Sequence, residues 1–248
     1  MVDALRRIGR FVAGKLPRIA YPVISGPLRG SRFVLGSLSG AGGGASVYFN
    51  MVETEQTAAI INALSIGRVL FDIGANVGYY TILGARLVGS QGKVIAVEPV
   101  IRNLVYLYKH TLLNKASNVS IIPAACSDTL SLATFSLGKN FSTGFLASRR
   151  HEGNSSERAS FLVPTVTVDA IVQQLGTCPD VIKVDVEGAE LSVLKGAQVT
   201  LREAKPRIFL STHSEVLRSN CLEYLTKLSY RFEVLSQDKD NPSEFLAK

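Results

Sequence analysis

The chain has 248 residues, a formal net charge of +7 and 46% hydrophobic residues. This length is enough for one full domain with a substantial buried core. No run approaches the roughly 18 apolar residues that span a bilayer. The apolar residues near the N-terminus are interrupted by Lys15, Pro17 and Arg18, which is not typical of a secretory signal. Three scattered cysteines favour reduced thiols and a cytoplasmic location over a disulfide framework.

The positive charge is concentrated at the start of the chain. Residues 1–35 hold seven Lys and Arg against one Asp, whereas the remaining residues hold 20 cations and 19 acids. This near-neutral body argues against a broad nucleic-acid-binding face. Residues 1–20 alternate cations with apolar residues, which predicts a basic amphipathic helix ended by Pro17. Such a helix either contacts an anionic membrane or packs on its own domain.

Two regions are expected along the chain. Residues 1–50 form a basic extension, in which residues 26–50 predict a hairpin between SRFVLGSL and VYF across the glycine-rich turn SGAGGGAS. Residues 51–248 form the main domain. Within it, residues 138–160 are polar and break the pattern of the flanking elements, which predicts an insertion, either a hairpin or a lid.

Helical and strand patterns alternate through the main domain. Helices are expected at 53–64, 78–89, 101–114, 168–175, about 189–204 and 215–228, and strands at 68–73, 93–99, 119–125, 180–186, 207–212, 230–236 and 243–248. This alternation predicts an α/β fold with a largely parallel sheet and helices on both of its faces. The last strand follows a polar turn, so it is expected to run antiparallel at or near the edge.

The helix at 101–114 has a stripe of apolar positions at Leu104, Leu107, Tyr108 and Leu112. Such a stripe indicates a helix packed along one face. His110 of this helix and His151 of the insertion are expected to face solvent.

The segment LFDIGANVGYYT places Asp72 at the end of a buried strand, directly before a glycine loop. In a doubly wound sheet, ligands bind beyond the carboxyl ends of the strands. Glu98 ends the next strand, 26 residues after Asp72, where an acid can bind both hydroxyls of a ribose. The loop and Glu98 together indicate an adenosine-type ligand. An Asp that only caps turn amides is the alternative for Asp72.

The loop composition favours a nucleoside without a diphosphate. A dinucleotide loop has glycine where this chain has Asn76, and Asp72 would repel a pyrophosphate. S-adenosylmethionine carries a positive amino group and a sulfonium, which suit a carboxylate. Gly74 and Gly78 can adopt backbone conformations that side chains forbid. An NAD(P)-dependent oxidoreductase and a non-catalytic adenosine-binding module remain alternatives.

The segments FDIGANVGYYT, AVEP, IKVDVEGAELSVLKGA and PRIFLSTHSE together resemble the FkbM-type methyltransferases over roughly residues 52–248. The resemblance implies a Rossmann-like class I methyltransferase fold with a seven-stranded sheet. It also implies transfer of a methyl group from S-adenosylmethionine to a hydroxyl of a sugar, glycolipid or polyketide-like molecule. An RNA or protein acceptor is a further alternative, although no RNA-binding module is evident.

The resemblance also assigns site residues. Asp72, Gly74, Asn76 and Gly78 would line the methionine part of the cofactor, Glu98 would hold the ribose, and Ala125 and Asp128 would flank the adenine. Asp185 and Glu187 would face the reaction cleft. The family often has Glu at the position of Ser211, so no metal site is expected here.

Three residues are candidates for removing a proton from the acceptor hydroxyl. Asp185 ends a central strand, and Glu187 follows two residues later on the same expected side. His213 ends the next parallel strand and would titrate near neutral pH. The alternatives are structural: both acids could stabilise the N-terminus of the following helix, and Thr212 with Glu215 could form a capping box.

Overall fold

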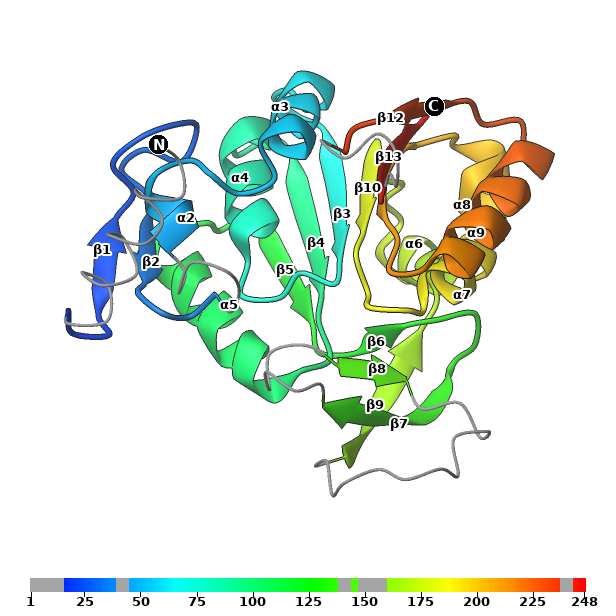
Figure 1. Ribbon diagram of the computed structural model, residues 1–248, viewed down its shortest axis with the longest axis horizontal. Helices are drawn as coiled ribbons and strands as arrows, with labels where there is room; N and C mark the ends of the chain where they lie inside the picture. Colours follow the sequence, from blue (N-terminus) through cyan, green and yellow to red (C-terminus); the bar gives the residue numbers. More distant parts are fainter. Residues whose placement is uncertain (1–15, 39–44, 138–143, 147–159, 237–242) are drawn as a thin grey trace.

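The computed structural model describes residues 16–38, 45–137, 144–146, 160–236 and 243–248. A seven-stranded sheet in the order β12-β13-β11-β10-β3-β4-β5 lies at its centre (Figure 1). Its strands are β3 (Val69–Ile73), β4 (Lys93–Val97), β5 (Val119–Ile122), β10 (Val181–Val184), β11 (Arg207–Ser211), β12 (Phe232–Val234) and β13 (Glu244–Ala247). β13 runs antiparallel to β11 and β12, and the other neighbouring strands pair in parallel. The predicted Rossmann-like α/β fold is confirmed.

Helices cover both faces of this sheet because successive residues of its buried strands point to opposite sides. Leu70 packs in one apolar cluster with Leu83, whereas the adjacent Phe71 packs in another with Leu225. The first face carries α3 (Thr54–Ala63), α4 (Tyr79–Val88) and α5 (Ile101–Leu113), and the second carries α6 (Val168–Leu175), α7 (Glu190–Lys195), α8 (Gln198–Glu203) and α9 (Glu215–Lys227). In the part of the chain described, no helix has the length and apolar character to cross a bilayer.

The single helix expected at 189–204 is instead two helices, α7 and α8, separated near Gly196. A Cβ at Gly196 would lie 2.0 Å from the carbonyl oxygen of Ser127, so the chain approaches that loop too closely for a side chain. Asp169 accepts hydrogen bonds from the backbone N–H groups of Val199 and Thr200, which caps the start of α8. A partner distant in sequence therefore starts the second helix.

The predicted pairing within residues 26–50 is wrong. β2 (Arg32–Val34) pairs antiparallel with β1 (Ala20–Pro22), and the VYF segment lies largely in the short helix α2 (Ala45–Tyr48). The Tyr48 hydroxyl donates to the Phe33 carbonyl at 2.7 Å, so α2 packs on the hairpin rather than extending it. The expected helix over residues 1–20 lies mostly outside the described residues; residues 16–20 are not helical.

His110 is buried, contrary to the prediction that it faces solvent. Its Nε2 accepts from the Val34 N–H at 3.0 Å, so its Nδ1 donates to the Val77 carbonyl at 2.7 Å. Burial lowers the pKa of His110, which keeps the imidazole neutral. This side chain therefore joins the N-terminal hairpin to the loop after β3. His151 lies outside the described residues.

The predicted apolar stripe of α5 is only partly correct. Leu107 is buried and Leu104 is half-buried, but Tyr108 and Leu112 are 60% and 61% exposed. The helix buries Asn103, His110 and Thr111 in their place. Polar side chains with partners inside the protein thus turn α5 away from the orientation that hydrophobicity alone predicts.

A second sheet of four strands lies beside the carboxyl ends of the central strands, in the order β6-β9-β7-β8. Its strands are β6 (Ala125–Cys126), β7 (Ser131–Leu137), β8 (Gly144–Leu146) and β9 (Ser160–Val166). The strand expected at 119–125 is divided between the two sheets because Pro123 has no N–H to continue the ladder. The rest of the predicted insertion, 138–143 and 147–159, lies outside the described residues, so its role as a lid stays a prediction.

Candidate active site

A pocket lies at the carboxyl ends of β3, β4 and β10, between the start of α5 and β7. It holds about 570 Å³ of space, part of it open to solvent. Six of the predicted site residues line it: Gly74, Asn76, Glu98, Ala125, Asp185 and Glu187. Asp72, Gly78, Asp128 and His213 are not part of its wall.

The glycine loop is shaped by close contacts. Gly74 has φ +83°, and a Cβ there would lie 1.9 Å from the carbonyl oxygen of Asp185. Gly78 has φ +94°, and its Cβ would lie 2.6 Å from the Leu107 side chain. Both positions therefore require glycine. Asn76 adopts a left-handed conformation, and its side chain accepts from the Val77 N–H at 2.8 Å.

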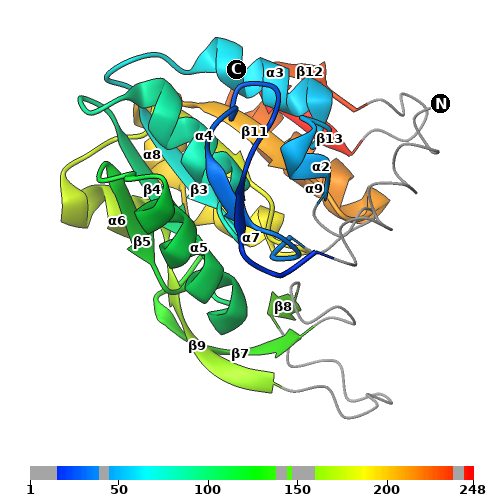
Figure 2. The same ribbon diagram turned by 90° about the vertical axis from the view of Figure 1, so that its left-hand side faces the viewer.

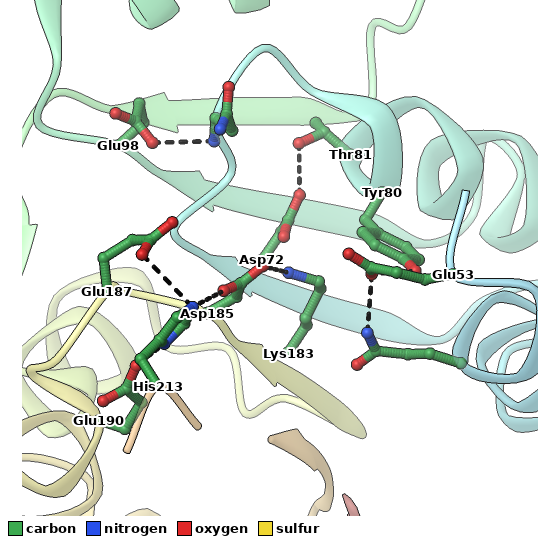
Figure 3. Close-up of polar contacts among 12 residues, drawn as sticks. Glu53, Asp72, Tyr80, Thr81, Glu98, Lys183, Asp185, Glu187, Glu190 and His213 are labelled. Carbon is green, nitrogen blue, oxygen red and sulfur yellow. Dashed lines mark hydrogen bonds and ion pairs between the residues drawn. The ribbon is translucent and has the colours of Figure 1, made fainter. Parts of the chain in front are cut away.

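Glu98 fixes this loop from the neighbouring strand. Its carboxylate accepts from the backbone N–H of Asn76 at 2.8 Å (Figure 3). It also accepts from the Val100 N–H at 2.9 Å and from the Asn103 amide at 3.1 Å. Burial raises the pKa of Glu98 to about 7, although the three donors oppose the shift. A carboxylate on the pocket wall is thus held in one position before any ligand arrives.

Asp72 lies behind the loop rather than on the pocket wall. It is 1% exposed, and its Oδ2 accepts from the Thr81 hydroxyl at 2.6 Å, while Oδ1 has no hydrogen-bond partner. Burial raises the pKa of Asp72, against the effects of Lys183 and Thr81. The side chain ties the end of β3 to α4, so direct contact with a cofactor stays a prediction.

His213 contacts three carboxylates of the segment from the end of β10 to the start of α7 (Figure 3). Its Nδ1 lies 2.6 Å from Glu190 Oε1, and its Nε2 lies 3.5 Å from Asp185 Oδ1 and 3.4 Å from Glu187 Oε2. The predicted meeting of Asp185, Glu187 and His213 at one edge of the sheet is therefore found. Ser214, not Thr212, caps α9 by accepting from the Leu217 N–H.

The charge states of this cluster differ from the expectation. The hydrogen bond to Glu190 raises the pKa of His213 to about 9; burial opposes this, and Asp185 and Glu187 add to it. His213 is thus an imidazolium at neutral pH, and the prediction that it titrates near neutrality is wrong. An imidazolium donates from both nitrogens and has no free site for a proton.

The carboxylates of Asp185 and Glu187 are not equivalent. Burial raises the pKa of Asp185, but Lys183 and His213 outweigh it, so the pKa lies below its usual value. Burial also raises the pKa of Glu187, and here it exceeds the opposing effect of His213. The Glu187 side chain is 43% exposed and Asp185 is 27% exposed. Glu187 is therefore the stronger base and the more accessible one.

A buried lysine, Lys183, holds Asp185. Lys183 is 2% exposed, its Nζ lies 3.0 Å from Asp185 Oδ2, and it lies 4.8 Å from the centre of the Tyr80 ring. The Tyr80 hydroxyl donates to Glu53 at 2.8 Å (Figure 3). This chain of contacts links the site to the start of α3.

Sequence reasoning missed four residues of the site. Lys183 is on β10 and Asp185 directly follows it, so their spacing of two predicts that both side chains point to the same side, a signal that was present in the sequence. Glu190, whose side chain is fully buried, is indistinguishable in sequence from an acid that stabilises a helix start. Asn103 and Phe135 line the pocket from α5 and β7, and no pattern marked them.

Ala125 and Asp128 are the two predicted site residues in the segment directly after β5. Ala125 is on the wall, near Val100 and Phe135, and is the first residue of β6. Asp128 is exposed and accepts from the Ser127 hydroxyl at 3.2 Å. Across the described ranges, no group of three or more His, Cys, Asp or Glu side chains is arranged to hold a metal ion.

Comparisons with known proteins place this architecture. The family model described as the methyltransferase FkbM domain matches residues 72–232. No curated protein matches significantly. A methyltransferase FkbM from Methylobacillus flagellatus KT has a TM-score of 0.53 and 18% identity, over 82% of this chain and 53% of that chain. A putative rRNA-methylase from Clostridium thermocellum has a TM-score of 0.51 and 12% identity, over 78% and 91%.

At these identities the two solved structures show the fold alone, and this chain spans about half the length of the Methylobacillus protein. The match to the family model shows more than the fold. It covers more than half of the chain and includes the glycine loop, Glu98 and the cluster around His213. The chain therefore belongs to the FkbM methyltransferase domain family.

Proposed function

We propose that this chain transfers a methyl group from S-adenosylmethionine to a hydroxyl of a small molecule, sugar or glycolipid. One observation carries the choice of cofactor. The described residues lining the pocket include the carboxylates of Glu98, Asp185 and Glu187, and neither Lys nor Arg. Lys183 and His213 contact Asp185 and Glu187 from outside this lining, so the groups that face the pocket itself are acids. Acids on the wall suit a sulfonium and an ammonium group, whereas the diphosphate of a dinucleotide would face carboxylates.

The residues present fit such a cofactor. Glu98 would accept from the ribose hydroxyls at the end of β4, as acids at this place in doubly wound sheets do. Val100, Ala125 and Phe135 form the apolar end of the pocket and would take the adenine. When bound, S-adenosylmethionine supplies an electrophilic methyl group. The match to the methyltransferase FkbM domain argues against an NAD(P)-dependent oxidoreductase.

The protein must remove a proton from the acceptor hydroxyl. Glu187 is the proposed base, because its raised pKa makes it a better proton acceptor than Asp185 and it lies on the pocket wall. Asp185, held by Lys183, would orient the acceptor. His213 would keep both carboxylates in place as a cation. The fold is shared with a putative rRNA-methylase and so leaves the acceptor class to experiment.

Glu187→Gln tests the assigned base. Transfer to the acceptor should fall by about 10²–10⁴-fold, the usual contribution of a general base. Affinity for S-adenosylmethionine should fall far less than transfer, because Glu98 and Asp185 remain on the pocket wall. Calorimetry with S-adenosylmethionine and with NAD measures binding. Methyl-labelled cofactor, incubated with lipid, carbohydrate and RNA fractions of a cell extract, measures transfer and its target.

Glu215→Gln is the matched control, since Glu215 is 82% exposed at the start of α9. Selective binding of NAD would contradict the cofactor. Label that appears in RNA would contradict the acceptor, and binding without transfer to any fraction would indicate a non-catalytic adenosine-binding module.

A further inference from the structure

The helix α5 has a second apolar face that nothing in the described structure covers. Its large apolar residues at spacings of four, three and four are strongly exposed: Ile101 65%, Val105 61%, Tyr108 60% and Leu112 61%. This spacing places them in one line along the helix. A helix that buries one face and exposes another apolar line marks a contact with an apolar partner.

Cations far outnumber acids in the part of the sequence that includes this line. Between Asp72 and Asp128 the only acid is Glu98, which is buried in the site, whereas the same segment holds Arg86, Lys93, Arg102, Lys109 and Lys115. Residues 16–38 contain three Arg and no acid. The positive charge of the chain is thus carried on the described surface as well as at its start.

A groove at the C-terminal end of α5 gathers three of these cations. Arg32 of β2, Arg86 of α4 and Lys115, just after α5, line it, and no acid is among the described lining residues. Arg32 is fixed there because its N–H donates to Asn114 at 2.7 Å. Arg86 donates to the Arg29 carbonyl at 3.0 Å and to the Ser31 hydroxyl at 3.4 Å, and among the described residues no carboxylate forms an ion pair with it.

The helix that carries the apolar line lies on the same side of the molecule as the elements that line the groove. In Figure 2, the β1–β2 hairpin, α4 and α5 lie together toward the viewer. Two further exposed apolar residues flank β1 on this hairpin, Ile19 at 55% and Ile24 at 57%. Apolar residues set among cations are the composition of helices that lie in the headgroup region of a membrane.

We propose that this face, formed by α5, the β1–β2 hairpin and the end of α4, binds an anionic lipid surface. The line from Ile101 to Leu112 would enter the boundary between headgroups and acyl chains, and the groove cations would contact lipid phosphates. RNA fits less well, because four exposed aliphatic and aromatic side chains offer little to phosphates. A second copy fits less well too, since two faces of the same charge repel.

Flotation of the full-length chain with vesicles tests this proposal. We expect binding to an equimolar mixture of phosphatidylcholine and phosphatidylglycerol, and much weaker binding to phosphatidylcholine alone. Val105→Ser with Leu112→Ser should weaken binding at least about ten-fold. Arg86→Gln with Lys115→Gln should weaken it roughly thirty-fold. Circular dichroism checks that each variant folds.

Matched controls come from the opposite side of the molecule. Val199→Ser with Val216→Ser removes residues that are 53% and 72% exposed on α8 and α9, and Lys195→Gln with Arg202→Gln removes two exposed cations. Both control pairs should bind vesicles as the parent does. Flotation needs neither a methyl donor nor an acceptor, so its result tests the membrane contact independently of the proposed methyltransferase function.

Four results would overturn the proposal. The first is that the chain does not bind vesicles, and the second is that the α5 variants and the control variants weaken binding equally. The third is that the chain binds vesicles but the α5 and groove variants leave this binding unchanged. The last is that the chain binds an RNA oligonucleotide or inorganic phosphate but not vesicles. The third result would place the membrane contact elsewhere in the chain. The last would assign the groove to a free or nucleic-acid phosphate.

Discussion

At the scale of single residues, His213 is the group on which the charges of the site depend. It contacts Asp185, Glu187 and Glu190, and its pKa of about 9 keeps it cationic when the carboxylates are ionised. Its charge lowers the pKa of Asp185 and of Glu187, so the loss of His213 should make Glu187 harder to ionise.

His213→Gln therefore predicts a change in pH dependence. Because the base must be ionised, the rising limb of kcat against pH should move to higher pH, by on the order of one unit. Initial rates between pH 5 and about 10 measure this limb. Glu215→Gln should leave the limb in place. A uniform loss of rate without a moved limb would instead mean that the imidazolium acts directly on the acceptor.

At the scale of elements, His110 connects three parts of the fold: β2, α5 and the loop after β3. Its imidazole must be neutral to accept from Val34. The lowered pKa means that, below its ordinary value of 6.5, the unfolded chain binds a proton that the folded chain does not. Its contribution to stability is complete above that pH and is lost as the pH falls toward the folded pKa.

Urea unfolding at about pH 8 and at about pH 5.5 measures this contribution. At the higher pH, His110→Gln should cost about 1–3 kcal/mol, because a buried hydrogen-bonding group loses its partner. The decrease in the free energy of unfolding from about pH 8 to about pH 5.5 that comes from His110 should be absent in the variant. Glu98 and Glu244, each with a pKa raised to about 7, act in the opposite direction, so the difference between variant and parent is the informative quantity. Tyr108→Gln, on the exposed side of the same helix, should have the same free energy of unfolding as the parent at both pH values.

The elements also differ in how much of their arrangement can be predicted from the sequence. Asp185, Glu187 and His213 were predicted to meet because the ends of neighbouring parallel strands share one edge, a rule that needs no tertiary detail. The β1–β2 pairing could not be predicted, since the strong glycine turn favoured a different partner. The burial of His110 depends on Val34 and Val77, 76 and 33 residues away, which no local pattern relates to it.

At the scale of the whole molecule, the sheet depends on β13. This strand pairs with β11 on one side and β12 on the other, so it is an interior strand although it follows both of them in the sequence. Leu246→Pro removes a ladder N–H from this strand and should cost about 3 kcal/mol or more. Leu246→Val, which keeps the backbone donor, should cost much less. Thermal unfolding compares the two, and similar melting temperatures would show that β13 contributes little.

The position of β13 also sets the order in which the sheet can be completed during synthesis. β12 emerges from the ribosome before the strand that must separate it from β11. During synthesis, β11 and β12 are therefore both present before β13, the strand that lies between them in the sheet. Neither can form its native pairing with β13 until Ala247 has left the exit tunnel.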